Sequence, residues 1–133
     1  MRHRGPDGTG IFLSNDCDVG LAHVRLAIIG VHTSAARQPV IDCDSGCAMT
    51  YNGEIYNYRE LAGKLGLEGR VSSDSDTQVL FSVFRKHGIR CLKTLNGMFA
   101  FAFFDNEEQA LYLVRDPYGI KPLRFPYPLK TII

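Results

Sequence analysis

The chain has 133 residues, of which 45% are hydrophobic and 11% aromatic, enough for one buried core and therefore for one domain or part of one. Its 15 basic and 14 acidic residues give a net charge of +1 and are scattered, without the basic stripe that nucleic-acid binding uses. The longest apolar run, Met98 to Phe104, is too short to span a bilayer. We therefore expect a folded cytoplasmic protein that binds neither nucleic acid nor membranes.

The cysteines indicate neither a disulfide framework nor a metal site. Cys17, Cys43, Cys47 and Cys91 form no CxxC pair and lack the dense spacing of secreted disulfide-rich proteins, so we expect reduced thiols. Cys43 and Cys47 with His32 would supply only three ligands, at a spacing that fits no common zinc pattern. We expect no metal in this chain.

The first part of the chain predicts short strands. Gly10 to Leu13 and Val19 to Ile29 are rich in aliphatic and β-branched residues, and the turn residues Ser14 to Asp16 separate them. A third apolar run, Cys47 to Tyr51, ends in Asn52-Gly53, a pair that is common at tight turns. We expect paired strands first, and then a strand that delivers Asn52 to a loop.

Two segments have the periodicity of amphipathic helices. Apolar residues recur at helical spacing from Tyr58 to Leu65 and stop before Gly66. A second helical pattern begins at Ser75, which forms a capping box with Gln78, and ends at Gly88. The chain therefore contains one short helix and one longer helix.

The apolar run from Met98 to Phe104 predicts a strand that is buried on both faces. The polar residues Asp105 to Glu108 then turn the chain into Leu111 to Val114, which predicts an antiparallel hairpin between other layers. Strands and helices in separate stretches are typical of a layered α+β domain.

Several segments carry polar residues or glycines in patterns that go beyond secondary structure. In chain order they are Arg2-His3-Arg4-Gly5-Pro6-Asp7, His23-Val24-Arg25-Leu26-Ala27-Ile28-Ile29, Gln38-Pro39-Val40, Tyr51-Asn52-Gly53-Glu54-Ile55-Tyr56-Asn57-Tyr58-Arg59-Glu60-Leu61, Ser75-Asp76-Thr77, Leu95-Asn96-Gly97-Met98-Phe99-Ala100-Phe101 and Arg115-Asp116-Pro117-Tyr118-Gly119-Ile120-Lys121-Pro122-Leu123. In content and order they resemble the glutaminase domain of the class II glutamine amidotransferases, most closely that of the glutamine-hydrolysing asparagine synthetases. We therefore expect a partial amidotransferase domain over residues 1–124 and a divergent tail over residues 125–133.

The resemblance implies the fold of the N-terminal-nucleophile hydrolases. That fold is a four-layer α/β/β/α sandwich with antiparallel sheets, here without its first strand and helix. In the family, a cysteine at the mature N-terminus attacks the glutamine side-chain amide, and its free α-amine can serve as the base. That cysteine would precede residue 1, and an internal cysteine has no free amine. We therefore expect the chain as printed not to hydrolyse glutamine.

The resemblance also implies the residues that bind the α-carboxylate of glutamine. Arg25 matches the position whose guanidinium binds this group, a task that suits a planar donor with two prongs. A structural ion pair is the alternative for Arg25, since a buried arginine needs a partner. The residues that would line the pocket after it are Leu26, Ala27, Ile28 and Ile29.

Four further positions match the family's catalytic and amino-group contacts. Asn52 and Gly53 match the oxyanion hole, which donates hydrogen bonds to the substrate oxygen as negative charge grows on it. Glu54 and Asp76 match the acceptors of the substrate α-amino group. Taken alone, Asn52-Gly53 is typical of a turn, and Asp76 suits the first turn of a helix without any ligand.

The function that the resemblance implies is that of a fragment of glutamine-hydrolysing asparagine synthetase. Its complete form hydrolyses L-glutamine to glutamate and ammonia and uses the ammonia for ATP-dependent amidation of aspartate. The expected partners are L-glutamine and a synthetase domain outside these residues, and ATP and magnesium serve only that domain. We expect no cofactor in this chain, and homodimerisation of the full-length form stays open.

Three alternatives remain at the level of sequence. The chain could belong to another class II amidotransferase that aminates a different acceptor. It could instead be a non-catalytic glutamine-binding or interaction module, or a gene remnant without function.

Overall fold

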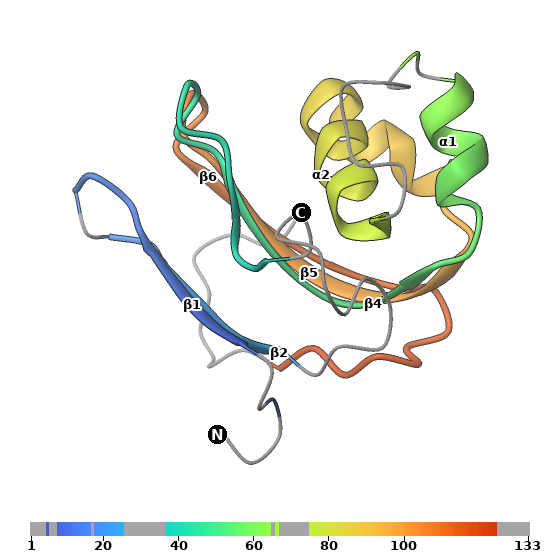
Figure 1. Ribbon diagram of the computed structural model, residues 1–133, viewed down its shortest axis with the longest axis horizontal. Coiled ribbons are helices and arrows are strands. Elements are labelled where there is room, and N and C mark those ends of the chain that lie inside the picture. Colours follow the sequence, from blue (N-terminus) through green and yellow to red (C-terminus); the bar gives the residue numbers. More distant parts are fainter. Residues whose placement is uncertain are drawn as a thin grey trace.

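The computed structural model describes residues 5, 8–16, 18–25, 37–64, 66 and 75–124, with Arg25 described by its backbone alone. In this part of the chain a small antiparallel sheet packs against one face of a larger antiparallel sheet, and the helices cover the other face (Figure 1). The described residues therefore form an α+β arrangement with antiparallel sheets, as predicted. The tail predicted over residues 125–133 lies outside them.

The smaller sheet consists of two strands, β1 (Gly8–Leu13) and β2 (Gly20–Arg25), paired from Gly8 opposite Arg25 to Leu13 opposite Gly20. Ser14 stabilises the turn between them, because its hydroxyl accepts a hydrogen bond from the Val19 N–H at 3.0 Å. The prediction of paired strands is confirmed as far as Arg25. Residues 26–29 lie outside the described part.

The larger sheet has the strand order β3-β4-β5-β6, and all neighbouring strands are antiparallel. Its strands are β3 (Val40–Ile41), β4 (Ala48–Ile55), β5 (Gly97–Asp105) and β6 (Ala110–Arg115). The register between β4 and β5 runs residue for residue from Ala48 opposite Phe104 to Ile55 opposite Gly97, so neither strand has a bulge. The hairpin predicted for β5 and β6 is confirmed.

The prediction of a turn at Asn52-Gly53 is wrong, because β4 continues through both residues to Ile55. At Gly53 and Gly97 the main chain of the neighbouring strand leaves no room for a side chain. A Cβ atom on Gly53 would lie 2.2 Å from the Met98 carbonyl oxygen, and one on Gly97 would lie 2.1 Å from the Glu54 oxygen. The glycine at position 53 therefore permits close strand pairing, and this long-range pairing overrides the local preference of Asn-Gly for a turn.

The helices begin and end close to the predicted residues. The two predicted helices are α1 (Tyr58–Lys64) and α2 (Asp76–His87), and a 3₁₀ helix that was not predicted, η3 (Gly88–Thr94), follows α2. The Ser75 hydroxyl caps α2 by accepting a hydrogen bond from the Gln78 N–H at 3.4 Å, and Gly88 follows its last residue with a φ of 55°. Both predicted helices are thus confirmed.

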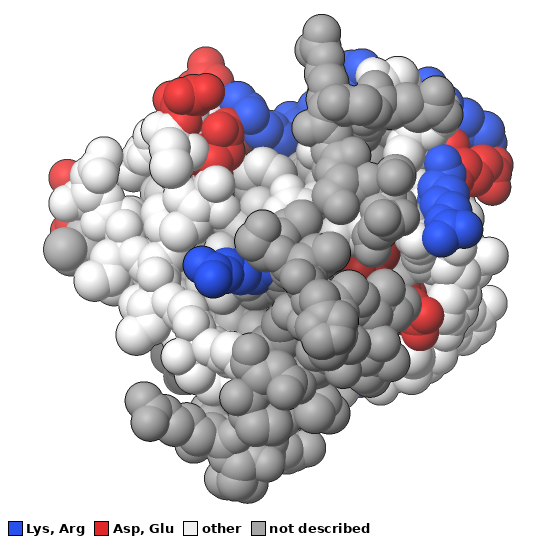
Figure 2. All heavy atoms as spheres, viewed as in Figure 1, with Lys and Arg blue, Asp and Glu red and all other residues white. Residues whose placement is uncertain are grey.

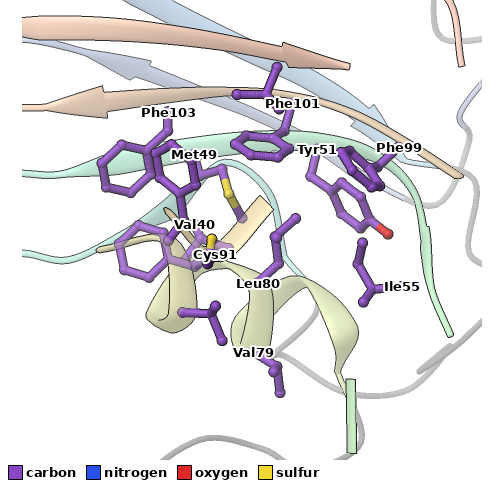
Figure 3. Close-up of a cluster of buried hydrophobic side chains, with 14 of the residues drawn as sticks. Val40, Met49, Tyr51, Ile55, Val79, Leu80, Cys91, Phe99, Phe101 and Phe103 are labelled. Atoms are coloured by element: carbon purple, nitrogen blue, oxygen red, sulfur yellow. The ribbon is translucent and has the colours of Figure 1, made fainter. Parts of the chain in front are cut away.

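The main hydrophobic core lies between the larger sheet and the helices (Figure 3). The Phe84 ring of α2 lies 5.1 Å from Phe101 and 5.0 Å from Phe103, and such aromatic pairs contribute about 0.5–1.5 kcal/mol each beyond their buried area. Phe99 belongs to the same cluster, whereas Phe104 packs on the opposite face of β5 against the smaller sheet. The strand is therefore buried on both faces, as its sequence predicts.

Charged side chains of both signs lie side by side at the rim of the molecule (Figure 2). One such pair, Arg85 with Asp42, joins α2 to the turn that follows β3. No helix in the described ranges is both long enough and apolar enough to cross a membrane.

Candidate functional site

The last half of β4 presents polar groups next to the core. Because side chains alternate along a strand, Tyr51 and Ile55 point into the helix-covered core, where they are 4% and 1% exposed, and Asn52 and Glu54 point the other way. Asn52 is exposed and Glu54 is half-buried. Within the described ranges, no hydrogen bond or ion pair engages either of these two side chains.

Asp76, the first residue of α2, joins this segment to the helix layer. One of its carboxylate oxygens, Oδ2, accepts hydrogen bonds from the Tyr51 hydroxyl at 2.8 Å and from the Ile55 N–H at 3.2 Å. The other, Oδ1, accepts one longer hydrogen bond, from the Thr77 hydroxyl at 3.4 Å. Asp76 therefore binds the two residues of β4 that flank the Asn52-Gly53-Glu54 segment, whereas the side chains of Asn52 and Glu54 point to the other face of the strand.

The environment of Asp76 favours a carboxylate that is held in one orientation. Its side chain is only 8% exposed, and it lies in the first turn of α2, where the helix dipole favours negative charge. Burial, the Asp76 charge and the hydrogen bond to Asp76 all raise the pKa of Tyr51 well above its ordinary value of 10.0. Tyr51 therefore remains a protonated donor to the carboxylate at every physiological pH.

Among the described residues, no strand pairs with the edge of β4 beside Gly53. Among the described strands, only β3 lies along this edge, and it pairs with the first two residues of β4 alone. Further along, the Gln38 side-chain oxygen accepts a hydrogen bond from the Tyr51 N–H at 2.6 Å, and Asp76 accepts one from the Ile55 N–H at 3.2 Å. Because N–H directions alternate along a strand, the Gly53 N–H points to this same edge, between the two.

The pairing on the other side of β4 agrees with this direction. Phe99 lies opposite Gly53 in the register of β4 and β5. Its N–H donates to the Asp116 carboxylate at 3.3 Å and its carbonyl accepts from the Asp116 N–H at 2.7 Å, so both groups point away from β4. Gly53 and Phe99 thus form a pair without mutual hydrogen bonds, which leaves the Gly53 N–H at the open edge.

The backbone of Arg25 lies at the same end of the sheets. Strands β2 and β4 both end toward the right of Figure 1. The His23 ring nitrogen Nδ1 lies 3.2 Å from the Thr50 hydroxyl, which joins the two strands two residues before Arg25 and Asn52. The Arg25 side chain and Leu26, Ala27, Ile28 and Ile29 lie outside the described part.

The described cysteines lie away from this segment. Cys43 is exposed in the turn after β3, while Cys47 and Cys91 are buried. Burial raises the pKa of the Cys91 thiol to about 11, which disfavours the nucleophilic thiolate. In the described ranges no three His, Cys, Asp or Glu side chains lie close enough to hold a metal ion, and His32 lies outside these ranges.

Two residues of the site received no role from the sequence, Tyr51 and Gln38. Tyr51 precedes Asn52 directly, and its alternation with the polar residues of β4 is a signal that it faces the core toward α2. Gln38 lies in the Gln38-Pro39-Val40 segment, but no local pattern indicates that its side chain reaches the Tyr51 backbone.

Comparison with known proteins agrees with the predicted resemblance. Residues 1–133 match the model of the glutamine amidotransferase domain family. The chain is 39% identical to asparagine synthetase B (glutamine-hydrolyzing) of Escherichia coli strain K12, over 96% of the chain and 22% of that protein. It is 42% identical to asparagine synthetase (glutamine-hydrolyzing) 1 of Bacillus subtilis strain 168, over 92% of the chain and 19% of that protein.

A relative with a different name matches over the same span. The chain is 37% identical to amidase chry2 of Gibberella zeae, over 94% of the chain and 18% of that protein. The chain thus spans about a fifth of the length of each of these relatives. Since the family model covers every residue and the relatives match nearly the whole chain, the chain belongs to the glutamine amidotransferase domain family.

Proposed function

We propose that this chain is the glutamine-binding part of a longer enzyme that takes ammonia from L-glutamine and transfers it to aspartate. The observation that carries the proposal is the contact of Asp76 with β4 on both sides of Asn52-Gly53-Glu54, at an open strand edge. The names of the E. coli and B. subtilis relatives support aspartate as the acceptor. ATP and magnesium would serve the synthetase part of the longer protein, and we assign no residue of this chain to them.

The polar groups at the end of β4 suit each part of a glutamine molecule. Asp76 and Glu54 are acceptors for the α-ammonium group, and the guanidinium of Arg25 suits the α-carboxylate. The Asn52 amide and the Gly53 N–H are donors for the side-chain amide oxygen, which gains negative charge when the amide is attacked. Loss of one such donor typically raises the barrier by about 3 kcal/mol.

We assign no nucleophilic role to the described cysteines. Cys43 and Cys47 lie at the end of β4 opposite to Asn52 and Gly53, and Cys91 is buried with a raised pKa. The contribution of the described residues is therefore to bind and orient glutamine and to stabilise charge on its amide oxygen.

Isothermal titration calorimetry of the 133-residue chain with L-glutamine tests the proposal. We expect saturable binding of L-glutamine and much weaker binding of D-glutamine, because the carboxylate and ammonium contacts distinguish the two. Asp76→Asn retains the shape of the side chain but removes its charge, and we expect it to weaken L-glutamine binding by about tenfold or more.

Asp44→Asn is the matched control, because Asp44 is an exposed carboxylate in the turn after β3. It should leave the dissociation constant unchanged. Equal affinities for L- and D-glutamine, or equal effects of the two substitutions, would contradict the proposal.

The amidase relative supports a second candidate, transfer of ammonia to an acceptor other than aspartate. The same residues would bind glutamine in either case, so the acceptor is determined by the remainder of the longer protein. Incubation of that longer protein with glutamine, ATP, magnesium and aspartate separates the two candidates. Asparagine among the products favours the synthetase, and glutamine consumption without asparagine favours the other acceptor.

A further inference from the structure

The Gln38 side chain takes the place of a strand at the open edge of β4. Strands β3 and β4 pair Val40 with Met49 and Ile41 with Ala48. Two residues further in this register, Gln38 would face Tyr51. The Tyr51 N–H is indeed bonded to Gln38, but to its side-chain oxygen, Oε1, at 2.6 Å.

The main chain of Gln38 has turned toward the smaller sheet. A Cβ atom added to Gly10 of β1 would lie 2.2 Å from the Gln38 carbonyl oxygen, so this carbonyl packs directly against Gly10. The β3 ladder therefore ends at Val40, and the Gln38 side chain satisfies the next N–H of β4.

The consequence concerns the N–H groups that β4 directs to this edge. Those of Tyr51 and Ile55 are bonded to side chains, Gln38 and Asp76, and the Gly53 N–H lies between them. If a regular strand continued along this edge past Tyr51, its main-chain carbonyl opposite Gly53 would accept a hydrogen bond from the Gly53 N–H. That carbonyl would then occupy the position of a substrate oxygen. A side-chain acceptor satisfies Tyr51 without carrying the ladder further.

We propose that Gln38 is a positioning residue that ends the β3 ladder and fixes the edge of β4, so that the Gly53 N–H stays available to the amide oxygen of glutamine. The inference rests on the proposed function and assigns to it a residue outside the predicted glutamine contacts. Gln38 acts through the Tyr51 backbone and does not itself contact substrate.

Three substitutions at position 38 test the role of the side-chain oxygen. Gln38→Met has nearly the same length but no acceptor, and Gln38→Asn keeps the amide but withdraws its oxygen by one carbon–carbon bond. Each should weaken L-glutamine binding in calorimetry by about fivefold, the effect of one neutral hydrogen bond. Gln38→Glu retains an acceptor at the same reach and should restore affinity to within about twofold of the unaltered chain.

Amide hydrogen exchange measured by NMR gives a readout that a general loss of stability would not reproduce. In the unaltered chain we expect the Tyr51 N–H to exchange slowly and the Gly53 N–H to exchange fast, with the Gly53 resonance shifting when L-glutamine is added. Gln38→Met should make the Tyr51 N–H exchange faster while core amides such as that of Phe101 keep their protection. Gln109→Met, in the exposed turn between β5 and β6, is the matched control and should change neither.

The outcomes separate the two proposals. If the unaltered chain binds L-glutamine and both Gln38→Met and Gln38→Asn bind it equally well, the positioning role is overturned while the proposed function stands. Slow exchange of the Gly53 N–H in the unaltered chain overturns the positioning role as well. If the unaltered chain does not bind L-glutamine, the proposed function fails, and the role of Gln38 in it fails too.

Discussion

Tyr51 links the core of the protein to its candidate site. The ring lies in the cluster between β4 and α2, while its hydroxyl donates to Asp76 at 2.8 Å (Figure 3 shows the ring beside Ile55). The backbone of the same residue donates to Gln38 at 2.6 Å. One residue thus fixes both the carboxylate of α2 and the edge of β4, directly before Asn52.

Replacing Tyr51 by phenylalanine removes only the hydroxyl. The Asp76 carboxylate then loses a donor in a buried site, and hydrogen bonds to charged groups typically contribute about 1.5–3 kcal/mol. We expect Tyr51→Phe to lower the free energy of unfolding by about this amount in urea titrations, and to weaken L-glutamine binding because Asp76 is less firmly oriented.

Tyr118→Phe is the control for this substitution, because the Tyr118 side chain is 89% exposed. It should change the free energy of unfolding by less than about 0.5 kcal/mol. Equal stabilities of the two variants would mean that the hydroxyl of Tyr51 does not stabilise the fold.

At the scale of elements, the segment after β6 is held by one carboxylate. Asp116 is buried and accepts hydrogen bonds from the N–H groups of Tyr118 at 3.1 Å, Ile120 at 2.9 Å, Lys121 at 3.0 Å and Phe99 at 3.3 Å. Burial raises the pKa of Asp116, but these backbone donors outweigh it and hold the pKa below its ordinary value of 3.8. The ionised carboxylate is therefore the form that fixes this segment to β5.

This lowered pKa gives the fold a pH dependence of predictable sign. Because the pKa is lower in the folded than in the unfolded chain, the contribution of Asp116 to stability is fully present above the ordinary value of 3.8 and is lost as the pH falls below it. The urea midpoint should decrease between neutral pH and about pH 3, and this decrease should be smaller for Asp116→Asn than for the unaltered chain.

Asp44→Asn, in the exposed turn after β3, serves as the control and should follow the unaltered chain. A pH dependence that is the same for Asp116→Asn and Asp44→Asn would show that the segment after β6 does not depend on the charge of Asp116.

At the scale of the whole molecule, the smaller sheet has an apolar outer face. Phe12 and Leu21 pack inward against the larger sheet, whereas Ile11 is 73% exposed and Leu13 is 61% exposed on the other side of β1. Exposed apolar residues on a sheet that has two strands in the described part of the chain favour association between molecules.

Substituting both residues should reduce this association. The double substitution Ile11→Thr and Leu13→Thr places a β-branched residue that suits a strand at both positions and removes apolar surface. We therefore expect less concentration-dependent light scattering of the 133-residue chain. Ile89→Thr, which replaces a 50% exposed isoleucine in η3, is the control and should leave the scattering unchanged. Scattering that is unaffected by the double substitution would contradict the prediction.

Short-range patterns in the sequence are enough to predict several elements of the fold. Helix α2 follows from the cap at Ser75 and its apolar periodicity, and β5 follows from seven apolar residues in succession, Met98 to Phe104. The order of its motifs also determined the family, because that order is a property of the chain and not of its fold.

The conformation of Asn52-Gly53 and the surroundings of the candidate site depend instead on long-range contacts. The pair is extended because Gly53 permits close pairing with β5, which a local turn preference does not reveal. The contacts of Tyr51 with Asp76 and with Gln38 join residues far apart in the chain. Such contacts depend on strand register and on the packing of α2 against the sheet, and both arise only when the whole core assembles.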